Sequence, residues 1–372
     1  MTTVLSASAP DGTADRAART DEPRIDEPRI DESWIRALPK AEVHVHLEGH
    51  FGLVDLLDLA KAAGEPLPGP AATLFDITTH HDTGGAGDLG AFLRFLDWEC
   101  GLVRTPEQAA RHAYTFAARQ TASGIRYTDA IINPTHWSAW EGRIPALFDA
   151  LAAGIDEAEQ DGLAPVRLAY SLLRQQSASA GREAAEWLAS THPRHVVALS
   201  IDGDERDSGR VSARFADAFA IARDAGLRRT VHAGESSGPE GVRDALDLLH
   251  AERIDHGIRA VEDPELLRRL ADERIPVGVC PRSNIVLGIY DDWAQHPLLV
   301  LRDAGVHVTV NTDDPGLLGT TLEADWAVCA DAFGLGRDDL AGFAAASITS
   351  SFADDDTKRR MTDELAATLA AG

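Results

Sequence analysis

Residues 229–257 read RTVHAGESSGPEGVRDALDLLHAERIDHG and contain a short apolar run, a helical stretch and a second short apolar run. The two runs, Arg229–Ala233 and Arg253–His256, have the length of strands. Between them, apolar residues recur at three- and four-residue spacing over 239–250, as in an amphipathic helix. This order predicts one strand–helix–strand unit of a parallel sheet with helices outside it.

The same alternation repeats along the chain from residue 34 onward. The eight predicted strands are Glu42–Leu47, Ile125–Ile132, Val166–Leu172, Val196–Ile201, Arg229–Ala233, Arg253–His256, Pro276–Cys280 and Val306–Asn311. Helical patterns cover 106–123, 145–161, 181–190, 211–225, 239–250, 263–273 and 295–304. Eight such units predict an α/β fold, a (β/α)8 TIM barrel. A doubly wound open sheet is the structural alternative.

Three regions lie outside a minimal barrel. Residues 52–105 form a long excursion after the first strand, of the kind that often makes a lid. Residues 321–370 read as two or three extra helices at the C-terminus. The first 33 residues are rich in charge and repeat the sequence DEPRI, so we expect a disordered tail over 1–33. Residues 34–372 are then a single barrel domain.

The composition argues against several classes of partner. Among 372 residues, 60 are acidic and 35 are basic, and the net charge of −25 repels phosphate backbones and acidic lipid. We therefore expect no nucleic-acid and no membrane partner, and we see neither a membrane-length apolar run nor a signal peptide. Cys100, Cys280 and Cys329 are too widely spaced for a disulfide framework or a CxxC zinc site. A cytoplasmic protein with a small-molecule substrate fits these features.

Histidine or acidic side chains occur on or directly after four of the predicted strands. HVH at 44–46 places two histidines on one face of the first strand, and HAGE at 232–235, DHG at 255–257 and NTDDP at 311–315 mark three further strand ends. Each signal alone is also compatible with a half-buried strand, a helix cap or an Asp-Pro turn. Together they converge on the face of a barrel where active sites lie. One set offers three nitrogens and a carboxylate, which suits one Zn²⁺ per chain with a position open for water: His44, His46, His232 and Asp313.

Several longer stretches resemble the adenosine deaminase family, which includes adenosine deaminases and adenine deaminases. They are LPKAEVHVHLEG at 38–49, HAGE at 232–235, RIDHG at 253–257, VCPRSN at 279–284, HP at 296–297 and VNTDDP at 310–315. The similarity covers about residues 36–350. The zinc deaminases that use a P-C-x-x-C motif are excluded, because the sequence contains no CxxC.

The resemblance implies a role for each site residue. Glu235 would protonate N1 of a 6-aminopurine while water attacks C6, and His256 would orient that water and take or stabilise its proton. Glu48 would face the sugar end of the substrate, Gly203 would contact N3 and Asp314 would contact N7. The zinc ligands would be His44, His46, His232 and Asp313, with Asp313 also part of the catalytic set. The products would be the 6-oxopurine and ammonia.

The sequence leaves the purine open. Glu48 stands where adenosine deaminases usually have Asp and adenine deaminases have Glu, whereas TVNTDDPGLLGT at 309–320 reads more like the nucleoside enzymes. The segment YTDAIINP at 127–134 departs from the family pattern, and Trp137 and Trp140 could line the pocket. We predict adenosine or 2′-deoxyadenosine as the substrate. The alternative is adenine, a modified adenine or another amino-heterocycle.

Two other function classes compete with a deaminase. An amidase or phosphotriesterase on the same barrel usually needs a bridging lysine, and the sequence has no lysine between Lys61 and Lys358. A catalytically inactive purine-binding protein would have lost part of the catalytic set. Here Glu235, His256 and the four ligands are all present.

Overall fold

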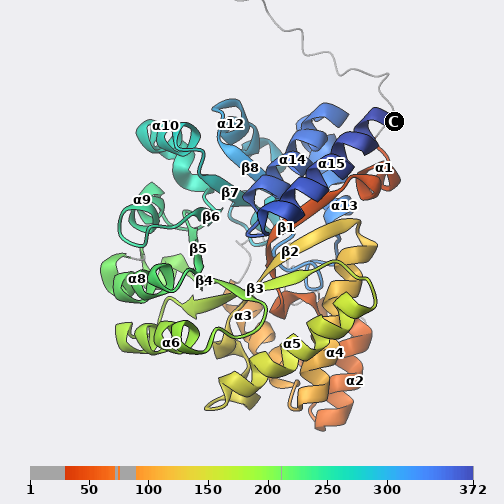
Figure 1. The fold of residues 1–372 in the computed structure, drawn as a ribbon, viewed down its shortest axis with the longest axis vertical. Coiled ribbons are helices and arrows are strands. Elements are labelled where there is room, and N and C mark those ends of the chain that lie inside the picture. The colour runs from red at the N-terminus through yellow and green to blue at the C-terminus, as the bar shows by residue number, and fades with distance from the viewer. Residues whose placement is uncertain (1–29, 72–73, 76–88, 211, 372) are drawn as a thin grey trace, which may run out of the picture.

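The computed structural model describes residues 30–71, 74–75, 89–210 and 212–371. Eight parallel strands follow one another around a single sheet in chain order, and helices lie outside them (Figure 1). The strands are β1 (Lys40–His46), β2 (Ile125–Ile132), β3 (Val166–Leu173), β4 (Val196–Asp202), β5 (Arg228–Ala233), β6 (Arg253–His256), β7 (Pro276–Val279) and β8 (His307–Val310). The chain is therefore a (β/α)8 TIM barrel, as the alternation predicts, and not an open sheet.

The barrel is closed between β8 and β1 by residues of the predicted metal site. The His46 N–H donates to the Asp313 carbonyl at 2.7 Å, and the Asp313 N–H donates to the His44 carbonyl at 3.3 Å. Val45 and Asp313 form the only bridge described there between the two edges. Closure of the fold thus places His44, His46 and Asp313 beside one another.

Helices connect successive strands of the barrel. They are α4 (Pro106–Ala122), α5 (Ile144–Gln160), α6 (Ala178–Thr191), α7 (Glu205–Ser208), α8 (Ala216–Asp224), α9 (Pro239–Asp247), α10 (Pro264–Asp272), α11 (Pro281–Val286) and α12 (Leu298–Asp303). Helix α12 begins three residues later than predicted, because Pro297 holds His296 in an extended conformation. The predicted helix at 211–225 is a 3₁₀ turn, η6 (Ser212–Phe215), followed by α8.

The excursion after β1 contains a short 3₁₀ turn, η1 (Glu48–His50), and the helices α2 (Leu53–Ala63) and α3 (Leu89–Gly101). Helix α3 packs against η1 and against η4 (Pro134–His136), a 3₁₀ turn that follows β2. It therefore lies over the end of the barrel where the strands finish. Residues 72–73 and 76–88 of this excursion lie outside the described residues.

Extra helices at the C-terminus are confirmed. They are α13 (Leu322–Phe333), α14 (Arg337–Ser350) and α15 (Asp355–Ala371), and α14 packs against β1 and β8 (Figure 1). Most of the predicted tail lies outside the described residues. Helix α1 (Glu32–Ala37) begins before the expected domain boundary at residue 34, because the Asp31 carboxylate accepts the Ser33 N–H and caps it. No helix of the described chain combines the length and the apolar character that crossing a bilayer requires.

Candidate active site

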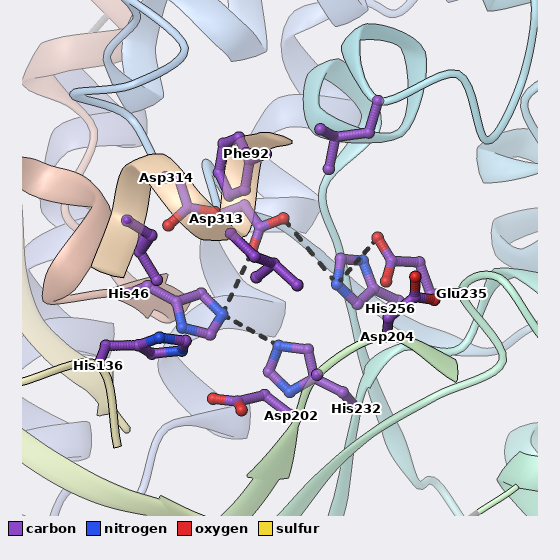
Figure 2. A pocket seen from close by; sticks show the side chains of 14 residues that line it. His46, Phe92, His136, Asp202, Asp204, His232, Glu235, His256, Asp313 and Asp314 are labelled. Carbon is purple, nitrogen blue, oxygen red and sulfur yellow. Dashed lines mark hydrogen bonds and ion pairs between the residues drawn. The ribbon is translucent and has the colours of Figure 1, made fainter. Parts of the chain in front are cut away.

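The predicted metal ligands meet at the C-terminal end of the barrel. His44 and His46 lie on β1, His232 lies on β5, and Asp313 follows β8. Figure 2 shows His46, His232 and Asp313 side by side. The Nε2 atom of His232 lies 3.1 Å from that of His44 and 3.0 Å from that of His46. Asp313 Oδ1 lies 3.2 Å from His44 Nε2 and 3.4 Å from His46 Nε2. The structure therefore brings together all four residues that the sequence pointed to.

These separations fit four donor atoms around one shared metal ion. With bonds of about 2.0–2.1 Å to zinc, neighbouring ligand atoms lie about 3 Å apart. The His44 Nδ1–H donates to the Gly278 carbonyl at 2.8 Å, so the Nε2 lone pair faces the other ligands. Cys280 Sγ lies 3.4 Å from that same Nδ1 and is thus on the far edge of the ring from the cluster. The four donor atoms, and the tautomer of His44, therefore fit a metal ion that takes nitrogen and oxygen ligands.

Buried polar groups orient these ligands from behind. Ser283 Oγ donates to Asp313 Oδ2 at 2.7 Å, and Asp255 Oδ2 lies 3.7 Å from His232 Nδ1. Asp313 and His256 both have positive φ, 68° and 66°, a conformation that residues other than glycine seldom adopt. Such backbone strain is typical of functional sites held in place by their surroundings.

Glu235 and His256 flank the cluster on one side (Figure 2). His256 Nε2 lies 3.6 Å from Glu235 Oε1 and 3.9 Å from Asp313 Oδ2. Burial, together with the charges of Asp313 and Glu205, raises the pKa of Glu235 to about 8. Glu235 therefore carries a proton at neutral pH and can act as an acid.

The turn that carries Glu235 is held by a buried carboxylate that sequence reasoning did not single out. Glu205 accepts four backbone N–H groups, from Gly234 at 3.0 Å, Glu235 at 2.8 Å, Ser236 at 3.0 Å and Ser237 at 3.1 Å. Arg174 lies 3.5 Å from the same carboxylate. The signal in the sequence is slight, because Glu205 stands beside Asp202 and Asp204 in a run of acids that reads as a loop.

We expect Glu205→Ala to weaken both the fold and the catalytic turn. The variant leaves four N–H groups and the Arg174 guanidinium without their partner, which should cost about 3–5 kcal/mol of unfolding free energy. Turnover should fall about 10- to 100-fold, as for other groups that orient a site from behind. Denaturant unfolding and kcat measure the two effects. Asp204→Asn is the control, because it keeps the side-chain oxygen that caps α7. Wild-type turnover in Glu205→Ala would show that the turn is held by other contacts.

A pocket opens beside the metal ligands. Its polar wall contains Asp202, Gly203, Asp204, His136 and Asp314, and its apolar wall contains Phe92, Leu93, Leu96 and Leu287. Gly203 has a φ of 101°, which glycine adopts without strain. A Cβ at Gly49 would lie 1.9 Å from Asp314 Oδ1, so a glycine there leaves room for that carboxyl. Burial and the Asp313 charge raise the pKa of Asp314 well above its usual range.

Three predicted pocket residues lie behind this wall. Glu48 is fully buried, and its Oε1 accepts the Asn133 N–H at 2.7 Å and the Trp137 Nε1–H at 2.9 Å. Trp140 donates instead to the Val103 carbonyl at 2.8 Å. Neither tryptophan is exposed or lines the pocket, so the interpretation of both as pocket residues is wrong. The Trp137 ring packs near the rings of Phe51 and His112, whose centroids lie 6.5 Å and 6.0 Å away.

Comparison with known proteins agrees with this geometry. The sequence model of the family described as adenosine deaminase matches residues 39–368. The chain belongs to the adenosine deaminase family. An adenine deaminase of Rhizobium leguminosarum bv. trifolii is 34% identical over 328 residues, which cover 87% of this chain and 98% of that protein.

Two solved structures are also similar. An adenine deaminase from Arthrobacter aurescens has a TM-score of 0.83 and 29% identity, covering 90% of this chain and 99% of that one. An amidohydrolase from Burkholderia ambifaria with bound zinc has a TM-score of 0.82 and 29% identity, covering 94% and 98%. As a member of the adenosine deaminase family, this chain is a metal-dependent deaminase, a hydrolase of C–N bonds in cyclic amidines.

Proposed function

We propose that this protein is a zinc-dependent adenine deaminase that converts adenine and water to hypoxanthine and ammonia. The observation that carries the proposal is the four-ligand cluster beside a protonated Glu235, in a chain whose relatives named above are adenine deaminases. These relatives favour the adenine alternative over adenosine or 2′-deoxyadenosine, the substrates that we first predicted. The cytoplasmic location stays a prediction.

The roles of the side chains follow from their positions. His44, His46, His232 and Asp313 would hold a zinc ion, which would supply Lewis-acid activation of water at neutral pH. Glu235 donates its proton to N1 of the purine as C6 is attacked, and His256 Nε2 orients the water and holds its proton. Asp314, whose raised pKa favours the protonated form, donates to N7, and the Gly203 N–H donates to N3.

Metal-loaded protein is expected to deaminate adenine, and removal of the metal should abolish turnover. Deamination at C6 changes the ultraviolet absorbance of a purine, and this change measures the rate of the reaction. The rates are compared for adenine, adenosine, 2′-deoxyadenosine and N6-methyladenine. Turnover should return when zinc is added back to chelated protein. Turnover of the nucleosides but not of adenine would contradict the proposal. It would support adenosine or 2′-deoxyadenosine as the substrate instead. No turnover of any of the four would mean that another amino-heterocycle is the substrate.

A further inference from the structure

Asp202 has an acceptor without a hydrogen-bond partner at the wall of the pocket. It is the last residue of β4, its side chain lines the pocket, and only 5% of the residue is exposed. Its Oδ1 accepts the Asn133 Nδ2–H at 2.5 Å. Its Oδ2 is buried and has no hydrogen-bond partner among the described residues. A buried acceptor without a partner is costly, so a ligand donor is the natural occupant of this position.

The order of strands around the barrel indicates which ligand atom faces Asp202. In the proposed pose N7 faces Asp314 after β8, N1 faces Glu235 after β5 and N3 faces Gly203 after β4. In a purine, N9 lies between N3 and N7 on the edge opposite C6. N9 therefore faces the side of the pocket that runs from β1 to β4, where Asp202 and His136 lie (Figure 2). Asp202 and Gly203 follow one another in the chain, and they then face N9 and N3, the two nitrogens bonded to C4 of the purine.

Charge on the surrounding groups favours this contact. His136 Nδ1 lies 2.7 Å from Asp97 Oδ1 of α3. Although burial opposes the charged imidazole, the bond to Asp97 and the charges of Asp202 and Glu48 raise the pKa of His136. The raised pKa of His136 favours its charged form, and that form is a favourable neighbour for the Asp202 carboxylate on the same wall. A carboxylate accepts from N–H but has nothing to offer a substituted nitrogen.

We propose that Asp202 accepts the N9–H of free adenine and thereby makes the site select the free base over 9-substituted purines. The inference rests on the proposed deaminase function and adds the residue that distinguishes the base from its nucleosides. In a nucleoside N9 has no hydrogen, and the sugar carbon would be placed against the carboxylate. Such loss of a required hydrogen bond is a strong means of discrimination.

The neighbours of Asp202 provide a sharp substitution. The Asn133 amide orientation is set by Thr135, whose N–H donates to Asn133 Oδ1 at 3.1 Å, so Asn133 Nδ2 faces residue 202. In Asp202→Asn the amide oxygen keeps the bond to Asn133, and an NH₂ group replaces Oδ2. The variant has nearly the same size and turns an acceptor into a donor. Asp202→Ala removes the group altogether, and Asp204→Asn alters a second carboxylate of the same pocket as a control.

The test compares adenine with 9-methyladenine, which lacks both the N9–H and any sugar hydroxyl. We expect both Asp202 variants to lower kcat/KM for adenine about 10- to 100-fold, the usual worth of a hydrogen bond to a charged group. The kcat/KM of both Asp202 variants for 9-methyladenine should stay unchanged or rise. Asp204→Asn should change kcat/KM for adenine and for 9-methyladenine by the same factor. Calorimetric binding of hypoxanthine and 9-methylhypoxanthine should show the same change of preference without turnover.

Two outcomes would overturn the inference while leaving the proposed function intact. In the first, wild-type protein uses 9-methyladenine as well as adenine. In the second, Asp202→Ala leaves the ratio of the two substrates unchanged, or lowers adenosine turnover more than adenine turnover because Asp202 holds a ribose hydroxyl. Wild-type protein that turns over none of these purines would instead overturn the proposed function, and the inference with it.

Discussion

Asp313→Asn is expected to lose the metal and all measurable turnover. Asp313 supplies the carboxylate of the cluster, with Oδ1 at 3.2 Å and 3.4 Å from the Nε2 atoms of His44 and His46. Replacing it with a neutral amide leaves three histidines and removes the only ligand that balances the charge of the ion. Asparagine tolerates the positive φ of 68° at this position, whereas alanine would add backbone strain. Zinc content after dialysis and deamination rate measure the two losses.

Ser283→Ala is the matched control for this substitution. Ser283 Oγ donates to Asp313 Oδ2 at 2.7 Å, so the control removes the support and keeps the ligand. Its metal affinity is expected to fall about 10- to 100-fold, with turnover recovered at high zinc. Because Asp313 also joins β8 to β1 through its backbone, thermal unfolding of each variant tests that the barrel is intact. If the Asp313→Asn variant keeps one zinc per chain, Asp313 is not a metal ligand.

The barrel was predictable because its strands differ strongly in composition from its helices. The predicted bounds of β2 and β6 match the structure, and the other strands differ by one or two residues at one end or at both. Apolar β-branched runs between Ala-, Glu- and Arg-rich helices mark these units clearly. The four ligands were found for the same reason, since each lies on or directly after a recognisable strand. The helix bounds were less accurate where Pro297 and the η6 turn interrupt the pattern.

Features that depend on packing across the barrel were not predictable. Glu205 is a loop acid in the sequence, and only the fold brings it to the turn at 234–237. The burial of Trp137 depends on Phe51, which follows η1, and on His112 of α4, both from earlier parts of the chain. Asp202 and Asn133 come from β4 and from the residue after β2, and no spacing in the sequence relates them. These contacts are set by the three-dimensional arrangement of strand ends, which a one-dimensional pattern does not contain.

Glu235→Gln is expected to keep the metal and lower kcat by about 10²- to 10⁴-fold, the usual contribution of a general acid. The amide has the same shape and can still accept hydrogen bonds, but it has no acidic proton to give to N1. The turn is unaffected, because Glu205 holds its backbone rather than its side chain. Zinc content therefore separates loss of the acid from loss of the site. Ser236→Ala is the control, since it alters a side chain of the same turn that has no hydrogen-bond partner among the described residues.

The pH profile gives the same assignment a second, independent test. The acid must be protonated to act, and the pKa of Glu235 is raised to about 8 by burial and by the Asp313 charge. Turnover by the wild-type protein should therefore hold below this pH and decline as the pH rises through about 8, up to tenfold per unit. In Glu235→Gln the residual rate should lack that decline, because no carboxyl is left to lose a proton. A variant that keeps near-normal activity, or the same alkaline decline, would show that N1 receives its proton from another group.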